Sequence, residues 1–370
     1  MRILIFAWRD IKNPNVGGSE IYFHELAKRW VKAENSVEMI VGGWKGCRKT
    51  ENIDGINIIR TGSSLTLYML APLAYKKLKQ KPDIIIDVEN GIPFFTPLFA
   101  KEKKILHIHH LHRGVWFKQL NPVFASIGYL IETKIMPLVY KKTPIITISK
   151  SSKEEIDLEN ISRVVGIVNP GIEYYKYKKY GKNKKPLVLF LNRIKKYKGL
   201  DILLKSVKQL NNKLDFDLLV AGTGDYLKEA QKYAKINNLK NVKFLGRISE
   251  AKKNELMQEA WVFVNPSFKE GWGIVNIEAN YFSLPVVGSN VSGIKDSIID
   301  GKTGLLFEYG NSHELAEKIK FLILHKKVRQ NMEKNAKLWA KKFDWGKKAD
   351  EYLKVLKTQC RNNNIYKSSF

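Results

Sequence analysis

The chain has 370 residues and a mass of 42.6 kDa, more than one hydrophobic core usually supports, so we expect two domains. Hydrophobic residues make up 44%, which excludes a disordered chain and indicates a globular protein. The formal net charge of +28 predicts attraction to polyanions such as nucleic acid, anionic lipid or phosphorylated substrates, although a general lysine bias explains it as well. Cys47 and Cys360 form no CxxC pattern, which argues against a disulfide framework and fits a reducing cytoplasm.

Apolar runs alternate with helical patterns through the first half of the chain. Residues 2–8, RILIFAW, are too short for the core of a signal peptide and predict a first buried strand. A helix and a second strand follow, which is the start of a βαβ unit. Further strands are predicted at residues 56–62, 82–90, 104–110 and 144–150. This alternation predicts a parallel sheet with helices on both faces.

The same alternation begins again after Lys185. The Lys- and Tyr-rich stretch 169–185 lacks apolar periodicity, so we place the linker there. The two cycles predict two Rossmann-like α/β domains, residues 1–172 and 173–345, that face each other across a cleft. The second set of strands is predicted at residues 186–194, 216–222, 242–248, 261–267 and 284–289, and a last helix at 344–359 precedes a polar, frayed end.

Residues 115–140 are strongly apolar but are interrupted by Lys118, Glu132 and Lys134. The uninterrupted apolar length falls short of a clean membrane-spanning helix. We therefore predict a core or interfacial helix.

Glu270 and Glu278 flank a glycine-containing loop, EGWGIVNIE, that follows a predicted strand. Ligands of parallel α/β sheets bind beyond the carboxyl ends of the strands, where this loop lies. Gly271 and Gly273 allow the backbone to approach a ligand, and the following helix presents N–H groups to hydroxyl or phosphate oxygens. Two carboxylates can accept hydrogen bonds from sugar hydroxyls. The alternative is structural, with Glu270 complementing the helix dipole and Glu278 solvated.

Arg193 and Lys198 follow another predicted strand, in the segment NRIKKYKG. Arginine chelates phosphate oxygens and lysine supplies a compact charge, so the pair could stabilise a departing nucleoside diphosphate without a metal. An ordinary solvated basic loop is the alternative. Gly17 and Gly18, at the end of the first strand, precede a helix and allow backbone amides to approach a phosphate.

The segment HIHHLH carries His107, His109, His110 and His112. Strand alternation would put the odd-numbered pair on one face and the even-numbered pair on the other. Three interpretations stay open: one sugar-contacting or catalytic histidine, packing, or a metal site. The segment itself has no acidic residue to support a metal.

Two other motifs are set aside. AGTGDY, which contains Gly222, lacks the third glycine of a dinucleotide fingerprint, so a dehydrogenase is rejected. Asp215 and Asp217 begin a predicted strand, at the end opposite to the ligand crevice, so they are not taken as a metal-binding pair.

Taken in order, GGSE, His109, NRIKKYKG and EGWGIVNIE resemble glycosyltransferase family 4, the retaining nucleotide-sugar-dependent enzymes of the GT-B fold. NPGIE, DGKTGLLF and FDW also resemble landmarks of that family, so the resemblance covers nearly the whole chain. Asn192 and Trp272 depart from it, because many relatives have glycine and phenylalanine there. Neither departure removes a charged contact.

The resemblance implies a role for each matching residue. Glu270 would contact the hydroxyls of the donor sugar, Glu278 the ribose, and Arg193 with Lys198 the diphosphate. His109 would be the active-site histidine, with His110 as the alternative. We assign the remaining donor-binding positions to Gly17, Gly18, Gly222, Gly271, Gly273, Ile274 and Val275. The C-terminal helix, residues 346–370, would pack back on the first domain.

The resemblance also implies a reaction: transfer of a hexose-type sugar to a glycan or lipid-linked acceptor in surface polysaccharide or glycoconjugate synthesis, with no cofactor and no obligatory metal. The basic balance and the apolar 115–140 segment predict peripheral contact with an anionic membrane from the cytoplasmic side. A sugar-nucleotide epimerase of the same fold is the alternative. A nucleic-acid-binding protein is disfavoured, because the sequence contains no recognised module of that kind.

Overall fold

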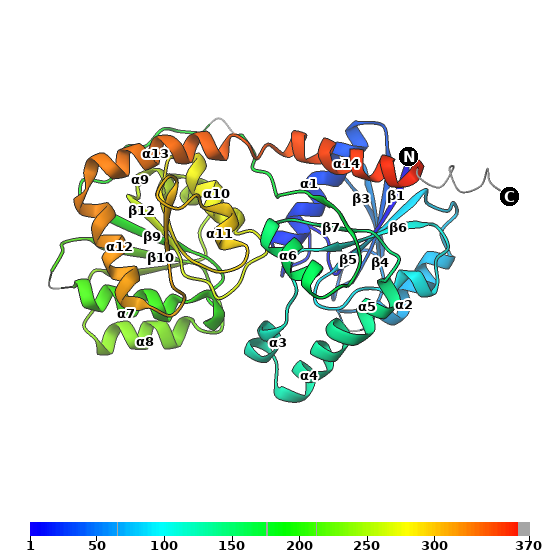
Figure 1. Ribbon diagram of the computed structural model, residues 1–370, viewed down its shortest axis with the longest axis horizontal. Coiled ribbons are helices and arrows are strands. Elements are labelled where there is room, and N and C mark those ends of the chain that lie inside the picture. The colour runs from blue at the N-terminus through cyan, green and yellow to red at the C-terminus, as the bar shows by residue number, and fades with distance from the viewer. Residues whose placement is uncertain (65, 175–176, 212, 362–370) are drawn as a thin grey trace. The chain divides into compact units, whose positions relative to one another are not determined.

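The computed structural model describes residues 1–64, 66–174, 177–211 and 213–361, so most of the predicted polar end lies outside the described residues. The chain forms two compact units, one of Met1–Gly171 with Trp345–Phe370 and one of Ile172–Asp344. Figure 1 shows that each unit is built on one sheet covered by helices.

The first unit contains an eight-stranded sheet of order β3-β4-β2-β1-β5-β6-β7-β8. Its strands are β1 Arg2–Phe6, β2 Ser36–Val41, β3 Thr50–Ile53, β4 Ile56–Arg60, β5 Ile84–Glu89, β6 Lys103–Ile108, β7 Ile145–Thr147 and β8 Val164–Ile167. Its helices are α1 Gly18–Lys32, α2 Leu67–Lys76, η1 Thr96–Leu98, α3 Gly114–Gln119, α4 Pro122–Leu130, the π-helical η2 Ile131–Ile135, α5 Met136–Tyr140, α6 Lys150–Leu158 and α14 Trp345–Arg361.

One edge of this sheet differs from the predicted parallel arrangement. β3 pairs antiparallel with β4 through the turn at Asp54 and Gly55, whose φ angles are 52° and 83°. Two consecutive positive φ angles are typical of a type I′ hairpin turn, for which Asp-Gly is a preferred sequence. The short strand β3 has no long apolar run, so hydrophobic periodicity alone missed it.

The second unit contains a six-stranded sheet of order β11-β10-β9-β12-β13-β14, in which every recorded pairing is parallel. Its strands are β9 Leu187–Leu191, β10 Asp217–Ala221, β11 Val242–Gly246, β12 Val262–Asn265, β13 Val286–Ser289 and β14 Gly304–Phe307. Its helices are η3 Lys196–Lys198, α7 Leu200–Leu210, α8 Leu227–Ile236, α9 Glu250–Glu259, α10 Ile274–Tyr281, α11 Ile294–Ser297, α12 Ser312–Leu324 and α13 Lys326–Ala340.

Apolar side chains of the second sheet bury against helices on both faces. One core joins the sheet to α7, α8 and α12, and another joins it to α9, α10 and α11. Strands covered on both faces are continuously apolar, as in Val262–Val264 of β12, which are all buried. This burial fixes the strand ends from which the candidate site is built.

The last helix, α14, belongs to the first unit although it follows the second unit in sequence. The indole Nε1 of Trp30 in α1 donates a hydrogen bond of 3.0 Å to the carbonyl oxygen of Ala349 in α14. The hydroxyl of Tyr352, which is fully buried, lies 3.1 Å from His107 Nδ1 on β6. The helix therefore covers the sheet beside α1.

The apolar stretch 115–140 was predicted to be either a core helix or an interfacial helix, and the structure shows that it is not a core helix. Only 28% of the 18-residue window in Pro122–Tyr140 is buried, and by length and composition alone this helical stretch could cross a membrane. Glu132, in its middle, is fully buried and binds the backbone N–H groups of His112 and Arg113. Figure 1 shows α3 and α4 standing away from the sheet of the first unit.

Candidate active site

The loops after β9 and β12 meet because these strands are parallel neighbours in the second sheet. The amide of Phe268 donates to the carbonyl of Tyr197 at 2.8 Å, which ties the two loops together. Gly199 has φ +73°, and a Cβ there would lie 2.0 Å from the carbonyl oxygen of Pro266. The close approach of the two backbones therefore requires glycine.

The tied loops bring Lys198 and Glu270 together. Lys198 Nζ donates to Glu270 Oε1 at 2.5 Å, and the side chains are 9% and 18% exposed. Burial lowers the pKa of Lys198, but the Glu270 carboxylate and, less strongly, Tyr197 raise it, and the net shift of the pKa is upward. Lys198 is therefore a fixed cation at neutral pH.

Arg193 lies exposed in the same loop, two residues beyond β9. The positive charge of Arg193 slightly lowers the pKa of Lys198. The two cations are therefore close enough to interact electrostatically. Two cations held close together at the carboxyl end of a strand suit a diphosphate.

A series of buried, hydrogen-bonded polar side chains holds Glu270 in place. These residues were not predicted from the sequence. The Ser267 hydroxyl lies 3.0 Å from Glu270 Oε1 and 2.9 Å from Asn265 Oδ1, so its one proton serves either oxygen. Asn265 Nδ2 donates to Asn276 Oδ1, and Asn276 Nδ2 donates to Ser297 Oγ, both at 2.9 Å. Fully buried polar groups with satisfied hydrogen bonds fix the orientation of their neighbours.

Backbone geometry explains glycine at position 273 of the EGWG segment and at position 293. Gly273, with φ +75°, is the N-cap residue of α10. The helix begins with Ile274 and Val275, whose amides belong to the first turn and so lack partners within the helix. A Cβ on Gly293, which has φ +81°, would lie 2.1 Å from Glu270 O and 2.8 Å from the carbonyl carbon of Gly271. The loop that carries Glu270 is therefore held tightly against residue 293.

Glu278 and Gly222 also have structural partners. Glu278 Oε1 lies 3.0 Å from Lys253 Nζ, a residue that the sequence had not singled out. The Glu278 side chain is 30% exposed, so it is within reach of a ligand as well. Gly222 has φ +135°, and a Cβ there would lie 1.9 Å from Asn192 O. Backbone packing alone thus accounts for glycine at position 222.

In the first unit, Gly17 is the N-cap residue of α1 and Gly18 is its first residue. Gly17 N donates to Glu20 Oε2 at 2.7 Å, so the glutamate of GGSE is used in capping its own helix. His109 follows β6, and its Nε2 lies 2.8 Å from Ser19 Oγ. The N-terminal turn of α1 and the end of β6 therefore meet at His109.

His109 is almost completely buried, packed edge-to-face against Tyr22 and Phe23. Burial, with a smaller contribution from His112, lowers the pKa of His109 to about 3. The imidazole is therefore neutral at physiological pH. The rings of His107 and His109 lie 4.5 Å apart, and those of His110 and His112 stack at 4.8 Å, so the odd and even pairs separate as alternation predicts.

His112 lies near two carboxylates that are distant in sequence. His112 Nδ1 lies 3.8 Å from Glu89 Oε1 and 4.0 Å from Glu132 Oε1. HIHHLH itself has no acidic residue, but folding brings Glu89 and Glu132 to His112. An acidic residue inside a long apolar stretch, as Glu132 is, was the available signal.

Two family models match consecutive parts of the chain. The model for Glycosyltransferase Family 4 matches residues 16–174, and the model for Glycosyl transferases group 1 matches residues 175–339. The chain belongs to the glycosyltransferases, with the family 4 and group 1 domains in tandem.

Curated relatives carry the same class of name. An uncharacterised glycosyltransferase of Methanocaldococcus jannaschii is 33% identical over 55% of this chain. The capsular polysaccharide biosynthesis glycosyltransferase CapM of Staphylococcus aureus is 31% identical over 61%. A Campylobacter jejuni N-acetylgalactosaminyltransferase named for a diphospho-undecaprenol substrate is 32% identical over 49%. These alignments span 56%, 63% and 46% of the three relatives.

Solved structures share the fold. Sucrose-phosphate synthase from Thermosynechococcus elongatus superposes with a TM-score of 0.79 at 19% identity, over 96% of this chain and 98% of that one. The Anabaena protein HepE, solved with UDP-glucose, gives 0.73 at 17% identity, over 97% and 100%. The expected GT-B fold and the expected glycosyltransferase family are confirmed.

Proposed function

We propose that this protein transfers a hexose-type sugar from a nucleotide diphosphate sugar to a glycan or lipid-linked acceptor, with retention at the anomeric carbon. The buried Lys198–Glu270 pair carries the proposal, because it holds a cation and a hydroxyl acceptor side by side at the carboxyl ends of β9 and β12. A donor with a diphosphate next to a sugar needs that combination.

In the transfer, the anomeric carbon exchanges its bond to a diphosphate oxygen for a bond to the acceptor hydroxyl oxygen. The hydroxyl proton leaves with the diphosphate. Lys198 and Arg193 stabilise the charge that develops on the leaving group, and the first-turn amides of α10 assist them. The proposed step uses these groups in place of a metal.

The other donor contacts divide between sugar and nucleotide. Glu270, held by Ser267, accepts hydrogen bonds from the sugar hydroxyls. Glu278 binds the ribose and exchanges its contact with Lys253 for it. Because His109 is neutral, it serves as a hydrogen-bonding group toward the transferred sugar rather than as a charged acid.

The donor can be identified with a thermal-shift panel of UDP-, GDP- and ADP-sugars, since a bound donor stabilises the folded state. The donor that stabilises the protein is then incubated with and without candidate acceptors, including undecaprenyl diphosphate-linked sugars. Release of nucleoside diphosphate that requires the acceptor supports transfer. Release or isomerisation without any acceptor would instead support the epimerase.

We further propose that the first unit rests on an anionic membrane through α3, α4 and α5, from the cytoplasmic side. Exposed apolar side chains cover this segment, with Val123 68%, Phe124 61% and Leu138 77% exposed. Lys118, Lys134, Lys141 and Lys142 are exposed beside them. Each basic residue near an anionic leaflet contributes about 1 kcal/mol. Because Glu132 fastens this segment to the first unit, surface contact is favoured over spanning.

Sedimentation with anionic and neutral liposomes tests this contact. Phe124→Asp and Leu138→Asp should each weaken binding to anionic vesicles several-fold. Leu158→Asp is the matched control, because Leu158 is 82% exposed on α6, outside the proposed surface. Equal binding by all three variants would remove the membrane contact and leave the transferase proposal standing.

A further inference from the structure

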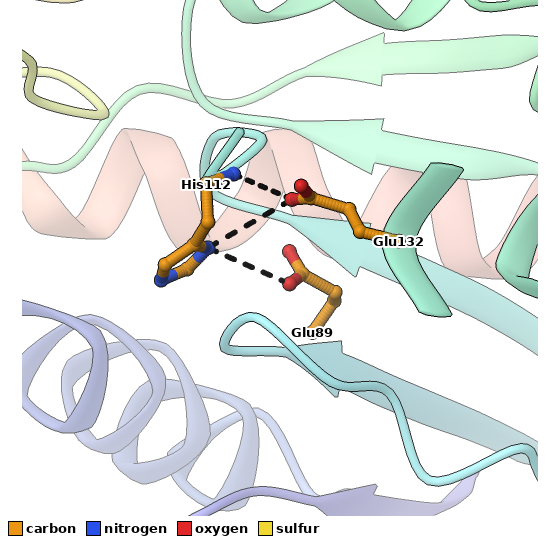
Figure 2. A group of neighbouring side chains, drawn as sticks. All are labelled: Glu89, His112 and Glu132. Carbon is orange, nitrogen blue, oxygen red and sulfur yellow. Dashed lines mark hydrogen bonds and ion pairs between the residues drawn. The ribbon is translucent and has the colours of Figure 1, made fainter. Parts of the chain in front are cut away.

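Three ionisable side chains from separate segments of the first unit converge on one point. Glu89 is the last residue of β5, His112 lies in the loop after β6, and Glu132 lies in the π-helical η2. Figure 2 shows both carboxylates and the imidazole directed toward one another. One ligand atom from each lies within 4.8 Å of the others.

The charges of this group are not balanced by its own members. Glu89 and Glu132 are fully buried. The Arg113 guanidinium lies 4.0 Å from Glu132 but 2.9 Å from Glu159, so its positive charge is shared between two carboxylates. Burying a carboxylate is costly unless a cation or several donors compensate it.

A protonated His112 would lie too far from the two carboxylates to donate a hydrogen bond of normal length to either. Its Nδ1 lies 3.8 Å and 4.0 Å from the two carboxylate oxygens, beyond the usual hydrogen-bond range of about 2.7–3.2 Å. Zinc bonds to imidazole nitrogen and carboxylate oxygen are about 2.0–2.2 Å long, so two ligands of one tetrahedral ion lie about 3.3–3.6 Å apart. The three ligand atoms, which lie within 4.8 Å of one another, would bind an ion after closing by up to about 1 Å.

The surrounding hydrogen bonds orient the carboxylates as the outer shell of a metal site does. Glu132 Oε2 accepts from Arg113 N at 2.9 Å, and its other oxygen accepts from His112 N at 2.5 Å. Glu89 Oε1 accepts from Gly91 N. The ring of Trp116 packs on His112, with centroids 5.0 Å apart, and limits its rotation.

We propose that Glu89, His112 and Glu132 bind one divalent first-row transition-metal ion, Zn²⁺ or Mn²⁺, in a structural site of the first unit. One imidazole with two carboxylates is a donor set for these ions rather than for Mg²⁺, which prefers oxygen ligands alone. The ion fastens the π-helical turn between α4 and α5 to the loop after β6. That loop begins at His109, so the ion positions the histidine without touching the substrate.

Metal content of the full-length protein tests the proposal independently of any transferase activity. Purified protein is analysed by plasma mass spectrometry, stripped with a chelator and titrated calorimetrically with Zn²⁺, Mn²⁺ and Mg²⁺. We expect about one Zn²⁺ or Mn²⁺ per chain and much weaker Mg²⁺ binding. Glu89→Gln and His112→Gln should each weaken the binding by at least about tenfold.

His110→Gln is the matched control, because His110 stacks on His112 but is not in the ligand set. It should bind the ion as the wild type does. Glu132 is left unchanged, since its carboxylate also holds two backbone amides and its replacement could unfold the loop. Circular dichroism checks that each variant is folded. Absence of Zn²⁺ and Mn²⁺ binding to the stripped wild type, or wild-type affinity in both ligand variants, would overturn the site.

Discussion

At the scale of single residues, Lys198 and Glu270 form a largely buried ion pair. In the proposed function Lys198 binds the diphosphate of the donor and Glu270 binds its sugar. Lys198→Ala should lower kcat by about two to three orders of magnitude, because a preorganised charge that stabilises a leaving group is typically worth that much. Glu270→Ala should lower turnover by a similar amount. Steady-state kinetics with the identified donor measures both.

Folding must be measured in the same variants. Removing one member of a buried ion pair leaves the other uncompensated, which costs about 3–5 kcal/mol of stability. The double variant removes both charges and should regain part of that stability without regaining turnover. A folded Glu270→Ala protein with wild-type turnover would refute its role in donor binding.

A second prediction at this scale concerns His109, whose pKa of about 3 is far below the ordinary value for histidine. Between about pH 3 and pH 6.5 the unfolded chain binds a proton at this residue and the folded chain does not, so stability rises with pH across that window and levels off above it. His109→Gln should reduce the slope by up to about 1.4 kcal/mol per pH unit.

Urea unfolding between pH 4 and pH 8 measures this slope. Burial also lowers the pKa of His107, so a residual slope of the same sign should remain in the variant. An unchanged slope in His109→Gln would show that His109 titrates normally in the folded protein.

The sequence supplied the charged residues of the candidate site but not the residues that hold them. Glu270, Lys198 and Arg193 follow strand ends, and that position is visible from apolar patterning. Ser267 and Asn276 lie in ordinary-looking segments and acquire importance only because folding buries them within hydrogen-bond distance. Spatial convergence of this kind leaves no periodic trace in a sequence.

At the scale of elements, the loop after β12 depends on close backbone approach. Gly293→Ala places a Cβ 2.1 Å from Glu270 O in a backbone with φ +81°, so it must displace the loop that carries Glu270. We expect lost donor binding together with lower stability. Thermal shift with and without the donor measures both effects.

Gly301→Ala separates the two causes. Gly301 has φ +72°, but no other atom lies within 4 Å of the Cβ position, so only the backbone strain of about 1 kcal/mol applies. It should keep donor binding intact. Loss of binding in both variants would mean that general destabilisation, and not contact with Glu270, explains the effect.

Elements with strong periodicity could be predicted, whereas those formed by local turn chemistry could not. The buried strands β1, β5, β9 and β12 all lie within predicted apolar runs. The hairpin strand β3 depends on two positive φ angles at Asp54 and Gly55. The stretch 115–140 was apolar enough for a core, and only the fold shows how much of it remains exposed.

At the scale of the whole molecule, the chain leaves the first unit, builds the second, and returns to complete the first with α14. Leu356 of α14 is fully buried, whereas Lys357 is exposed. Leu356→Ala should destabilise the first unit by about 2–5 kcal/mol through lost burial and a cavity. Lys357→Ala should change stability by less than about 0.5 kcal/mol.

Hydrogen exchange resolves where the destabilisation falls. Because α14 is the last helix in the sequence but packs on α1, the amides of β1, β5 and β6 should exchange faster in Leu356→Ala. Amides of β9 and β12 should keep wild-type protection, and the donor should still protect them, because their core contains no residue of α14. Faster exchange in β9 and β12 alone would show that α14 stabilises the second unit instead.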